Sequence, residues 1–295
     1  MEKDKEPLRL AWKTIFFSLL AVSIPAWLGF WGWQTWRHNR SQNTQYAIHA
    51  IIQTGPQKEA LKTVFLEELL NLSCDVPCNL YSFSLEKAQD QLLSCPVIKT
   101  ASLKKIFPDT LYIDYSVRTP IALVHEYTNT GVDEEGIIFP IAPFFTPKRL
   151  PEFHLGLPCY GVGEVWGEKL TSAESQIALE LLKILNERPY RELMRILRID
   201  VANAFSPSFG QRQIVVILED EAVLEKSNQL VTYQFPRILR LTPKNFKQEL
   251  QNYLNLREEL IAQELKKENS SNTVLVKCPS TIIDMRLDGV AYVRH

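Results

Sequence analysis

Residues 84–118 carry the pattern that decides the fold of the first half of this chain, and they read SLEKAQDQLLSCPVIKTASLKKIFPDTLYIDYSVR. Ser84 is a typical helix cap, and apolar residues follow it at helical spacing: Leu85, Ala88, Leu92 and Leu93. Pro96 ends this helix, because proline cannot continue the hydrogen-bond ladder. Residues 97–105 and 111–117 then alternate as two strands around the turn Phe107-Pro108-Asp109.

A strand and another helix precede this pattern. Residues 46–53 favour a strand, which Gly55-Pro56 ends. Residues 57–72 place apolar side chains at helical spacing: Leu61, Val64, Phe65, Leu69 and Leu72. The predicted order of residues 44–126 is therefore β-α-α-β-β.

Residues 127–295 predict a second, mixed β domain, with helices packed on an antiparallel sheet, so the fold class is α+β. A hairpin-like element is expected at residues 133–140, with Gly136 at its turn. Helices are predicted at residues 171–186, with Thr171 as the cap, and at residues 245–267, where the polar run 269–272 ends the second one. Strand patterns occur at residues 196–201, 213–219, 235–241 and 281–294, the last around Asp288-Gly289.

The N-terminal part of the chain carries a long uncharged run, from Thr14 to Trp36. The run exceeds the roughly 20 apolar residues that cross about 30 Å of hydrocarbon, and tryptophans lie at both of its ends, as at membrane interfaces. It predicts a transmembrane helix at residues 14–36, in contact with the lipid bilayer, after a cytoplasmic tail at residues 1–13. The alternatives are a buried core helix and a cleaved signal peptide, which has a shorter apolar region and a small-residue cleavage site.

The flanking charges favour a cytoplasmic N-terminus. Four basic residues precede the run and two follow it closely: Lys3, Lys5, Arg9 and Lys13 before it, Arg37 and Arg40 after it. All five cysteines lie after the run, which suits an oxidising compartment. We expect at least one disulfide among Cys74, Cys78 and Cys95, although buried free thiols are the alternative for some of them.

The composition and motifs argue against catalysis and against nucleic acid as a partner. The net charge is −1, and a nucleic-acid binder normally shows a basic stripe. No hydrolase, zinc-protease or phosphate-loop motif occurs. The five histidines are scattered, with none paired at metal-ligand spacing. The chain is therefore predicted to be no enzyme and to have no catalytic residue, cofactor, metal site or small-molecule substrate.

Several short stretches, in this order, resemble the POTRA domain and β domain of the FtsQ/DivIB cell-division proteins. In the first domain they are Asn79-Leu80-Tyr81, residues 92–101 and residues 107–113. Arg118-Thr119-Pro120-Ile121-Ala122 is similar to the family's E-R-x-P-x-A stretch, with Val117 in place of the glutamate. Further landmarks are the D-x-x-G-x-x-F signature at residues 133–139, Leu150-Pro151, and Ile283-Asp284-Met285-Arg286, which is similar to the stretch opening the family's last strand.

The resemblance implies a bacterial division scaffold in the inner membrane at the division site, which links partners of the FtsB/FtsL type to septal peptidoglycan synthesis. It also implies that a partner adds along the last strand, whose unpaired backbone groups invite β-augmentation. The motif places this contact at Arg286 and Leu287. At the position of Leu287 the family often has an aromatic residue. The local alternation adds Val290, Tyr292 and Arg294, although Leu287 and Val290 could instead pack into the core.

Two other classes of protein remain as alternatives. A POTRA-bearing chaperone or secretion module of the envelope is expected to show repeated POTRA units or a following barrel, and this sequence has neither pattern. An anchored extracytoplasmic enzyme would need a catalytic constellation, and the sequence presents none. The division scaffold is therefore the favoured interpretation.

Overall fold

The computed structural model describes residues 6–72, 78–158, 163–226, 229–267, 275–287 and 289–294. The chain divides into two compact units, Met1–Ser116 and Val117–His295, and each unit has its own sheet. The predicted α+β class is confirmed. The division lies earlier than the predicted boundary after residue 126, because strand β4 (Ala122–Val124) pairs with strands of the second unit.

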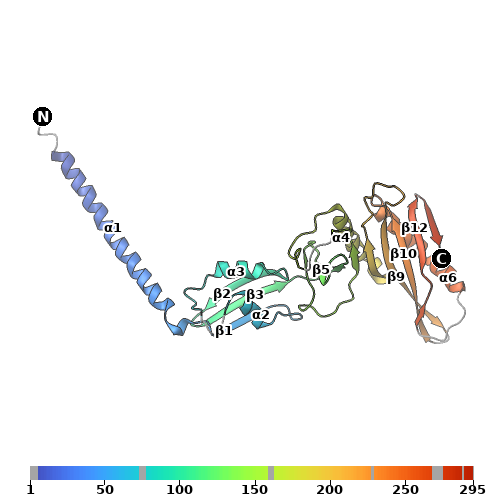
Figure 1. Cartoon of the computed structure of the whole chain (residues 1–295), viewed down its shortest axis with the longest axis horizontal. Coiled ribbons are helices and arrows are strands. Elements are labelled where there is room, and N and C mark those ends of the chain that lie inside the picture. Colours follow the sequence, from blue (N-terminus) through green and yellow to red (C-terminus); the bar gives the residue numbers. More distant parts are fainter. Residues whose placement is uncertain are drawn as a thin grey trace. The chain divides into compact units, whose positions relative to one another are not determined.

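The N-terminal helix α1 spans Glu6–Ser41 and includes the whole uncharged run at residues 14–36 (Figure 1). Its large apolar side chains, such as Trp27 and Trp31, are exposed, so α1 is not a core helix. Within the described part of the chain, no helix combines the length and the apolar character needed to cross a membrane. The side chains of residues 1–15 and 17 lie outside the described part, including those of the predicted tail and of the start of the predicted span.

Aromatic and polar contacts join the end of α1 to the rest of the first unit. The Arg40 guanidinium lies 4.3 Å from the ring centroid of Trp36 and donates a 2.5 Å hydrogen bond to the Tyr81 hydroxyl. The Asn79 side-chain amide donates to the carbonyls of Arg40 and Asn43, at 3.1 and 2.9 Å. A short 3-10 helix, η1 (Thr44–Tyr46), then leads into the sheet. These contacts satisfy the carbonyls at the helix end.

The predicted β-α-α-β-β order of the first unit is confirmed. Its elements are β1 (Ala50–Thr54), α2 (Thr63–Leu69), α3 (Leu85–Leu93), β2 (Ile98–Ile106) and β3 (Thr110–Val117). The sheet has the order β1-β3-β2, and β1 runs parallel to β3. Helix α2 is shorter than the predicted residues 57–72, because the backbone turns at Glu59 before the helix and at Asn71 after it.

Local sequence features determine where the elements of the first unit begin and end. The Ser84 hydroxyl accepts a hydrogen bond from the Lys87 amide, as predicted for a helix cap. Gly55 ends β1 at a place where a Cβ atom would lie 2.7 Å from the Tyr115 ring, so glycine is needed there. The core consists of fully buried apolar side chains from α2, α3, β2, β3 and the segments that connect them: Leu66, Leu80, Ala88, Leu92, Val97, Ile98, Leu111 and Ile113.

The expected disulfide is not formed between Cys78 and Cys95, which are free thiols. Cys95 is buried just after α3, and this burial raises the pKa of its thiol. It therefore behaves as a small apolar core residue. Cys74, the third cysteine of the prediction, lies outside the described residues.

The second unit is built on one large sheet with the strand order β13-β12-β10-β9-β8-β7-β4-β5-β6, and β11 pairs with β10 beside β12. Besides β4, the strands are β5 (Thr130–Val132), β6 (Ile138–Pro140), β7 (Glu152–His154), β8 (Met194–Asp200), β9 (Ile214–Lys226), β10 (Gln229–Leu241), β11 (Leu275–Lys277), β12 (Thr281–Leu287) and β13 (Val290–Arg294). The sheet is mixed, because β12 is parallel to β10 and β7 is parallel to both β4 and β8. It is therefore not the purely antiparallel sheet that the sequence predicted.

The predicted turn around Gly136 is confirmed. It brings together two of the sequence motifs, the stretch that begins at Arg118 and the D-x-x-G-x-x-F signature at residues 133–139. Gly136 has a φ of +82°, a conformation that favours glycine. One carboxylate oxygen of Asp133 accepts from the amides of Glu135 and Ile137, at 3.0 and 2.9 Å. The other is 2.7 Å from the Arg118 guanidinium, so an ion pair joins the arginine and aspartate motifs.

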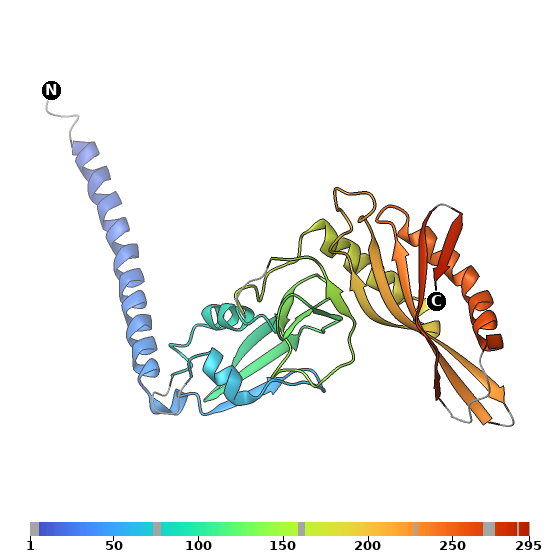
Figure 2. The same cartoon turned by 45° about the vertical axis from the view of Figure 1, so that its right-hand side comes forward.

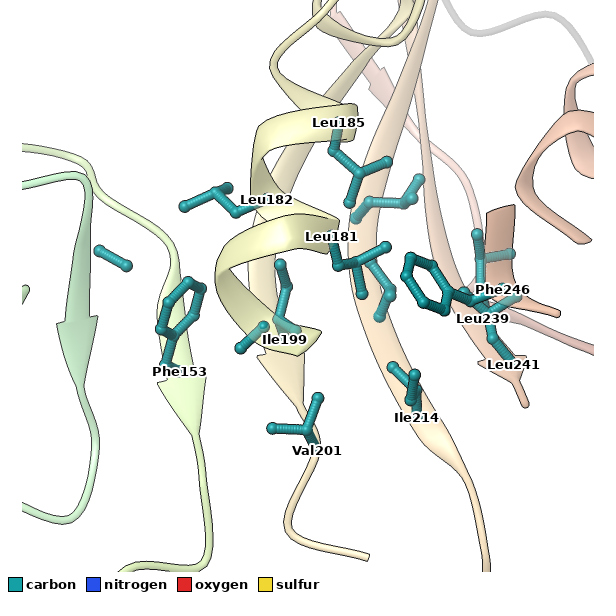
Figure 3. Packing of buried hydrophobic residues seen from close by; sticks show 14 of the residues in the cluster. Phe153, Leu181, Leu182, Leu185, Ile199, Val201, Ile214, Leu239, Leu241 and Phe246 are labelled. Atoms are coloured by element: carbon teal, nitrogen blue, oxygen red, sulfur yellow. The ribbon is translucent and has the colours of Figure 1, made fainter. Parts of the chain in front are cut away.

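Two helices, α4 (Ala173–Leu185) and α6 (Phe246–Lys267), pack their apolar side chains into one cluster with the sheet. Figure 3 shows Leu181 of α4 pointing towards Phe246 of α6, with Ile199 and Ile214 of the sheet beside them. The N-cap of α4 is Ser172, whose hydroxyl accepts from the Ser175 amide, and not the predicted Thr171. A single-turn helix, α5 (Tyr190–Leu193), follows α4 and leads into β8.

A buried network of charged side chains joins α6 to the sheet. Arg237 of β10 is fully buried, and its guanidinium is 2.6 Å from Glu264 of α6 and 3.5 Å from Asp220 of β9. Asp220 also receives hydrogen bonds from Arg257, at 3.0 Å, and from the Tyr253 hydroxyl. Burial, and then the negative charge of Asp220, raises the pKa of Tyr253 well above its usual value. Each charge is thus buried together with an opposite charge.

Replacing Arg237 with leucine should strongly destabilise the second unit. The substitution leaves the carboxylates of Asp220 and Glu264 buried with one cation fewer, which typically costs about 3–5 kcal/mol. Amide hydrogen exchange of β9 and β10 in the purified chain measures the change. The control is Lys247→Ala, which removes an exposed ion pair with Glu180 and should cost less than about 1 kcal/mol. A loss of similar size in both variants would contradict the importance of the buried network.

Candidate protein-interaction edge

The last two strands form a hairpin at one end of the large sheet, next to α6 (Figure 2). Gly289 provides the turn with a φ of +72°, and the strands pair antiparallel, Ile283 beside Val293 and Asp284 beside Tyr292. On its other side, β13 has no strand neighbour among the described residues. Since alternate backbone groups of an edge strand point away from the sheet, β13 offers unpaired donors and acceptors to another chain.

The side chains of β13 divide between the core and the solvent. Ala291 and Val293 pack against the core cluster of the second unit. Val290, Tyr292 and Arg294 are exposed, and Leu287 at the end of β12 is exposed too, with Tyr292 64% exposed. The structure therefore brings four of the five predicted contact residues together at one solvent-facing edge, and Leu287 and Val290 are not core residues.

Arg286 lines the same cleft as Leu287, Val290 and Tyr292, but it is half-buried and bound by neighbouring groups. Its guanidinium binds both carboxylate oxygens of Asp284, at 2.9 and 2.7 Å, and donates to the Gly210 carbonyl at 3.3 Å. Burial alone would raise the pKa of Asp284, but the hydrogen bonds from Arg286 lower it below its usual value. Arg286 thus connects β12 to the loop between β8 and β9.

A cleft with aromatic walls lies beside the exposed residues of the hairpin. It is lined by Leu287, Val290 and Tyr292 together with Phe205 and Phe209, from the loop between β8 and β9. Phe209 is 83% exposed, and the Arg212 guanidinium lies 4.7 Å from its ring centroid. Exposed apolar patches of this kind are typical of interaction sites. We call these five apolar residues the edge patch.

The sequence alone did not identify Phe205 and Phe209 as part of the site. The only signal is two aromatic residues in a polar loop, Ala202-Asn203-Ala204-Phe205-Ser206-Pro207-Ser208-Phe209-Gly210. Their position beside the last strands follows from the pairing of β10 with both β9 and β12.

Helix α4, predicted at residues 171–186, packs its apolar face against the sheet. Its residues Ala178, Leu181, Leu182 and Leu185 are buried against the sheet (Figure 3).

A second cluster of chemically active side chains lies where β4 and β7 run side by side. His125, Glu152 and His154 could together hold a metal ion, because their ligand atoms all lie within 4.8 Å of one another. Burial, followed by the charges of Arg198 and His125, lowers the pKa of His154 below its usual value. The histidines show no metal-ligand spacing along the sequence, but the pairing of β4 with β7 brings His125 beside His154, which is far away in the chain.

The comparisons with known proteins agree with the fold of the first unit. Residues 67–114 match the model of the POTRA domain, FtsQ-type, and this segment extends from α2 to β3. A search of curated proteins found no match to the chain. The match supports the FtsQ/DivIB family predicted from the motifs, a family of membrane-anchored, non-catalytic division scaffolds.

Replacing Arg286 with alanine should loosen the hairpin. The substitution removes charge-assisted hydrogen bonds to Asp284, each worth about 1.5–3 kcal/mol, and the pKa of Asp284 should rise towards its usual value. Hydrogen exchange of β12 and β13 should therefore become faster by about tenfold or more. Arg294→Ala, at an exposed position on the same hairpin, is the control and should leave the exchange unchanged. Equal exchange in both variants would show that the ion pair does not support the hairpin.

Proposed function

We propose that this chain, which carries an FtsQ-type POTRA domain, is a scaffold protein of bacterial cell division. In this proposal it connects single-pass division proteins of the FtsB/FtsL type to the septal peptidoglycan machinery and catalyses no reaction. The observation that carries the proposal is the FtsQ-type POTRA domain at residues 67–114, followed by a second unit with an open edge strand.

The proposed anchor is α1, with residues 14–36 in the inner membrane. The uncharged run with tryptophans at its ends supports this role. So does the exposure of its described apolar side chains, which the rest of the chain does not bury. The basic residues before the run favour a cytoplasmic N-terminus and extracytoplasmic units.

The proposed docking site is the outer edge of β13 together with the edge patch. A partner strand that pairs with β13 would gain main-chain hydrogen bonds, which give affinity with little dependence on sequence. Leu287, Val290 and Tyr292 would then supply specificity by contacting apolar side chains of the partner, with Phe205 and Phe209 beside them. Arg294, exposed on the same strand, is the candidate for a charged contact.

Proline at an outward-facing position of β13 should abolish partner binding. Proline removes one backbone donor from the edge, whereas alanine at the same position keeps it. Hydrogen exchange first identifies which amides of β13 are bonded to β12 and which face outward. We expect the outward-facing variant, Val290→Pro or Tyr292→Pro, to remain folded and to lose capture of a purified FtsB-type partner. The matching alanine variant should keep most of its binding.

The same proline variants can also contradict the proposed docking site. If both proline variants fold, as judged by hydrogen exchange of β9 and β10, and still capture the partner, the edge is not used. The partner would then have to bind at another surface.

The membrane topology can be tested in cells. A reporter that is active only outside the cytoplasm should work when it is fused after Arg294, because positive-inside counting places the C-terminus there. A fluorescent protein at the N-terminus should concentrate at the division site. An active cytoplasmic reporter after Arg294 would reverse the topology, and an even membrane signal throughout division would contradict the scaffold role.

A further inference from the structure

The seam between β4 and β7 carries a histidine–carboxylate cluster with no role in the proposed scaffold. The two strands are parallel, with Leu123 beside Glu152 and Val124 beside Phe153. The His125 amide continues this ladder by donating to the Phe153 carbonyl at 2.9 Å. His125 therefore lies beside His154, and Glu152 shares the same face of the sheet, because side chains two residues apart in a strand point the same way.

We propose that His125, Glu152 and His154 form a binding site for a divalent transition-metal ion of the zinc class. Two imidazoles and a carboxylate are a ligand set that zinc uses in proteins. The remaining coordination positions would be open to water, because His125 is exposed. The site is independent of the docking edge.

The distances are close to those that a metal ion needs. The ligand atoms of the three residues lie within 4.8 Å of one another. The two imidazole rings are stacked with centroids 3.8 Å apart, so the His125 ring must turn for both nitrogen lone pairs to point at one ion. Metal bonds of about 2.0–2.2 Å in a tetrahedral arrangement require ligand atoms about 3.3–3.6 Å apart. Rotation of the exposed His125 and the half-buried Glu152 can close this difference, while His154 is held by the sheet.

His154 is the residue whose environment points most directly to a ligand. Its Nε2 atom is buried and has no hydrogen-bond partner among the described residues. The nearest carboxylate oxygen, on Glu152, is 3.7 Å away, which is too long for a hydrogen bond. A buried polar atom without a partner loses the energy of its contacts with water, and a metal ion bound to Nε2 would remove this penalty.

The charges around the cluster determine how tightly a cation binds. Arg198 of β8 lies 3.1 Å from the Glu152 carboxylate and therefore competes with a metal ion for this ligand. Glu126 acts in the opposite sense: one of its oxygens accepts from the amides of Leu155 and Gly156, each at 2.6 Å, and its other oxygen is buried without a hydrogen-bond partner in the described structure. Removing Arg198 should thus strengthen metal binding.

The test uses the full chain in detergent micelles, without a polyhistidine tag and after treatment with a chelator. Calorimetric titration with Zn²⁺ should show one site that depends on the cluster, and Co²⁺ should give the visible absorption of a low-coordinate complex. His125→Ala and His154→Gln should each weaken Zn²⁺ binding by at least about tenfold. The matched control, His49→Ala, changes an exposed histidine of the first unit and should leave binding unchanged.

Arg198→Ala separates a metal site from a purely structural cluster, because it keeps all three ligands. Tighter Zn²⁺ binding in this variant supports the proposal. Unchanged or weaker binding in a variant that melts like the original chain without metal would overturn it. The proposal also fails if the original chain binds no Zn²⁺. It fails as well if both histidine variants keep full affinity, because the ion would then be bound elsewhere, for example by cysteine thiols.

Discussion

The second unit depends on the pairing of buried charges around Arg237. A guanidinium that is fully removed from water is tolerated only when opposite charges and hydrogen bonds surround it. Glu264, a residue of α6, contributes to this environment. Its carboxylate accepts a hydrogen bond from the Arg237 guanidinium of β10 at 2.6 Å and another from the Thr281 hydroxyl at 2.9 Å. Thr281 is the first residue of β12. The network therefore determines where α6 lies and where the last hairpin begins.

The interaction edge is a consequence of this arrangement. Because β12 pairs parallel with β10, the short antiparallel partner β13 is left as the outermost strand. Ala291 and Val293 hold β13 on the core, so its other face and its outer backbone groups remain available. Arg286 and Asp284 bind each other within β12, and Arg286 also reaches the Gly210 carbonyl of the loop between β8 and β9.

Local patterns in the sequence predicted the elements that are long and periodic. Helix α3 begins after Ser84 as expected, and α4 and α6 occur within one or two residues of their predicted ranges. The three-residue strands β4, β7 and β11 were not predicted, because so short a segment shows no periodicity. Strands β9 and β10 extend well beyond the predicted apolar cores, since cross-strand pairing continues where the alternation of apolar residues has ended.

The sequence by itself determined the order of the first unit, the uncharged N-terminal run and the resemblance to a family of division scaffolds, since each depends on residues that are close together in the chain. The local alternation also placed Val290 and Tyr292 on one face of the last strand, and the family motif pointed to Leu287. Only the tertiary structure decided that Arg286 reaches the Gly210 carbonyl, that Phe209 lies beside the last hairpin, and that His125 meets His154. These contacts depend on which strands become neighbours in the sheet, and that pairing is set by packing and buried charges across the whole unit.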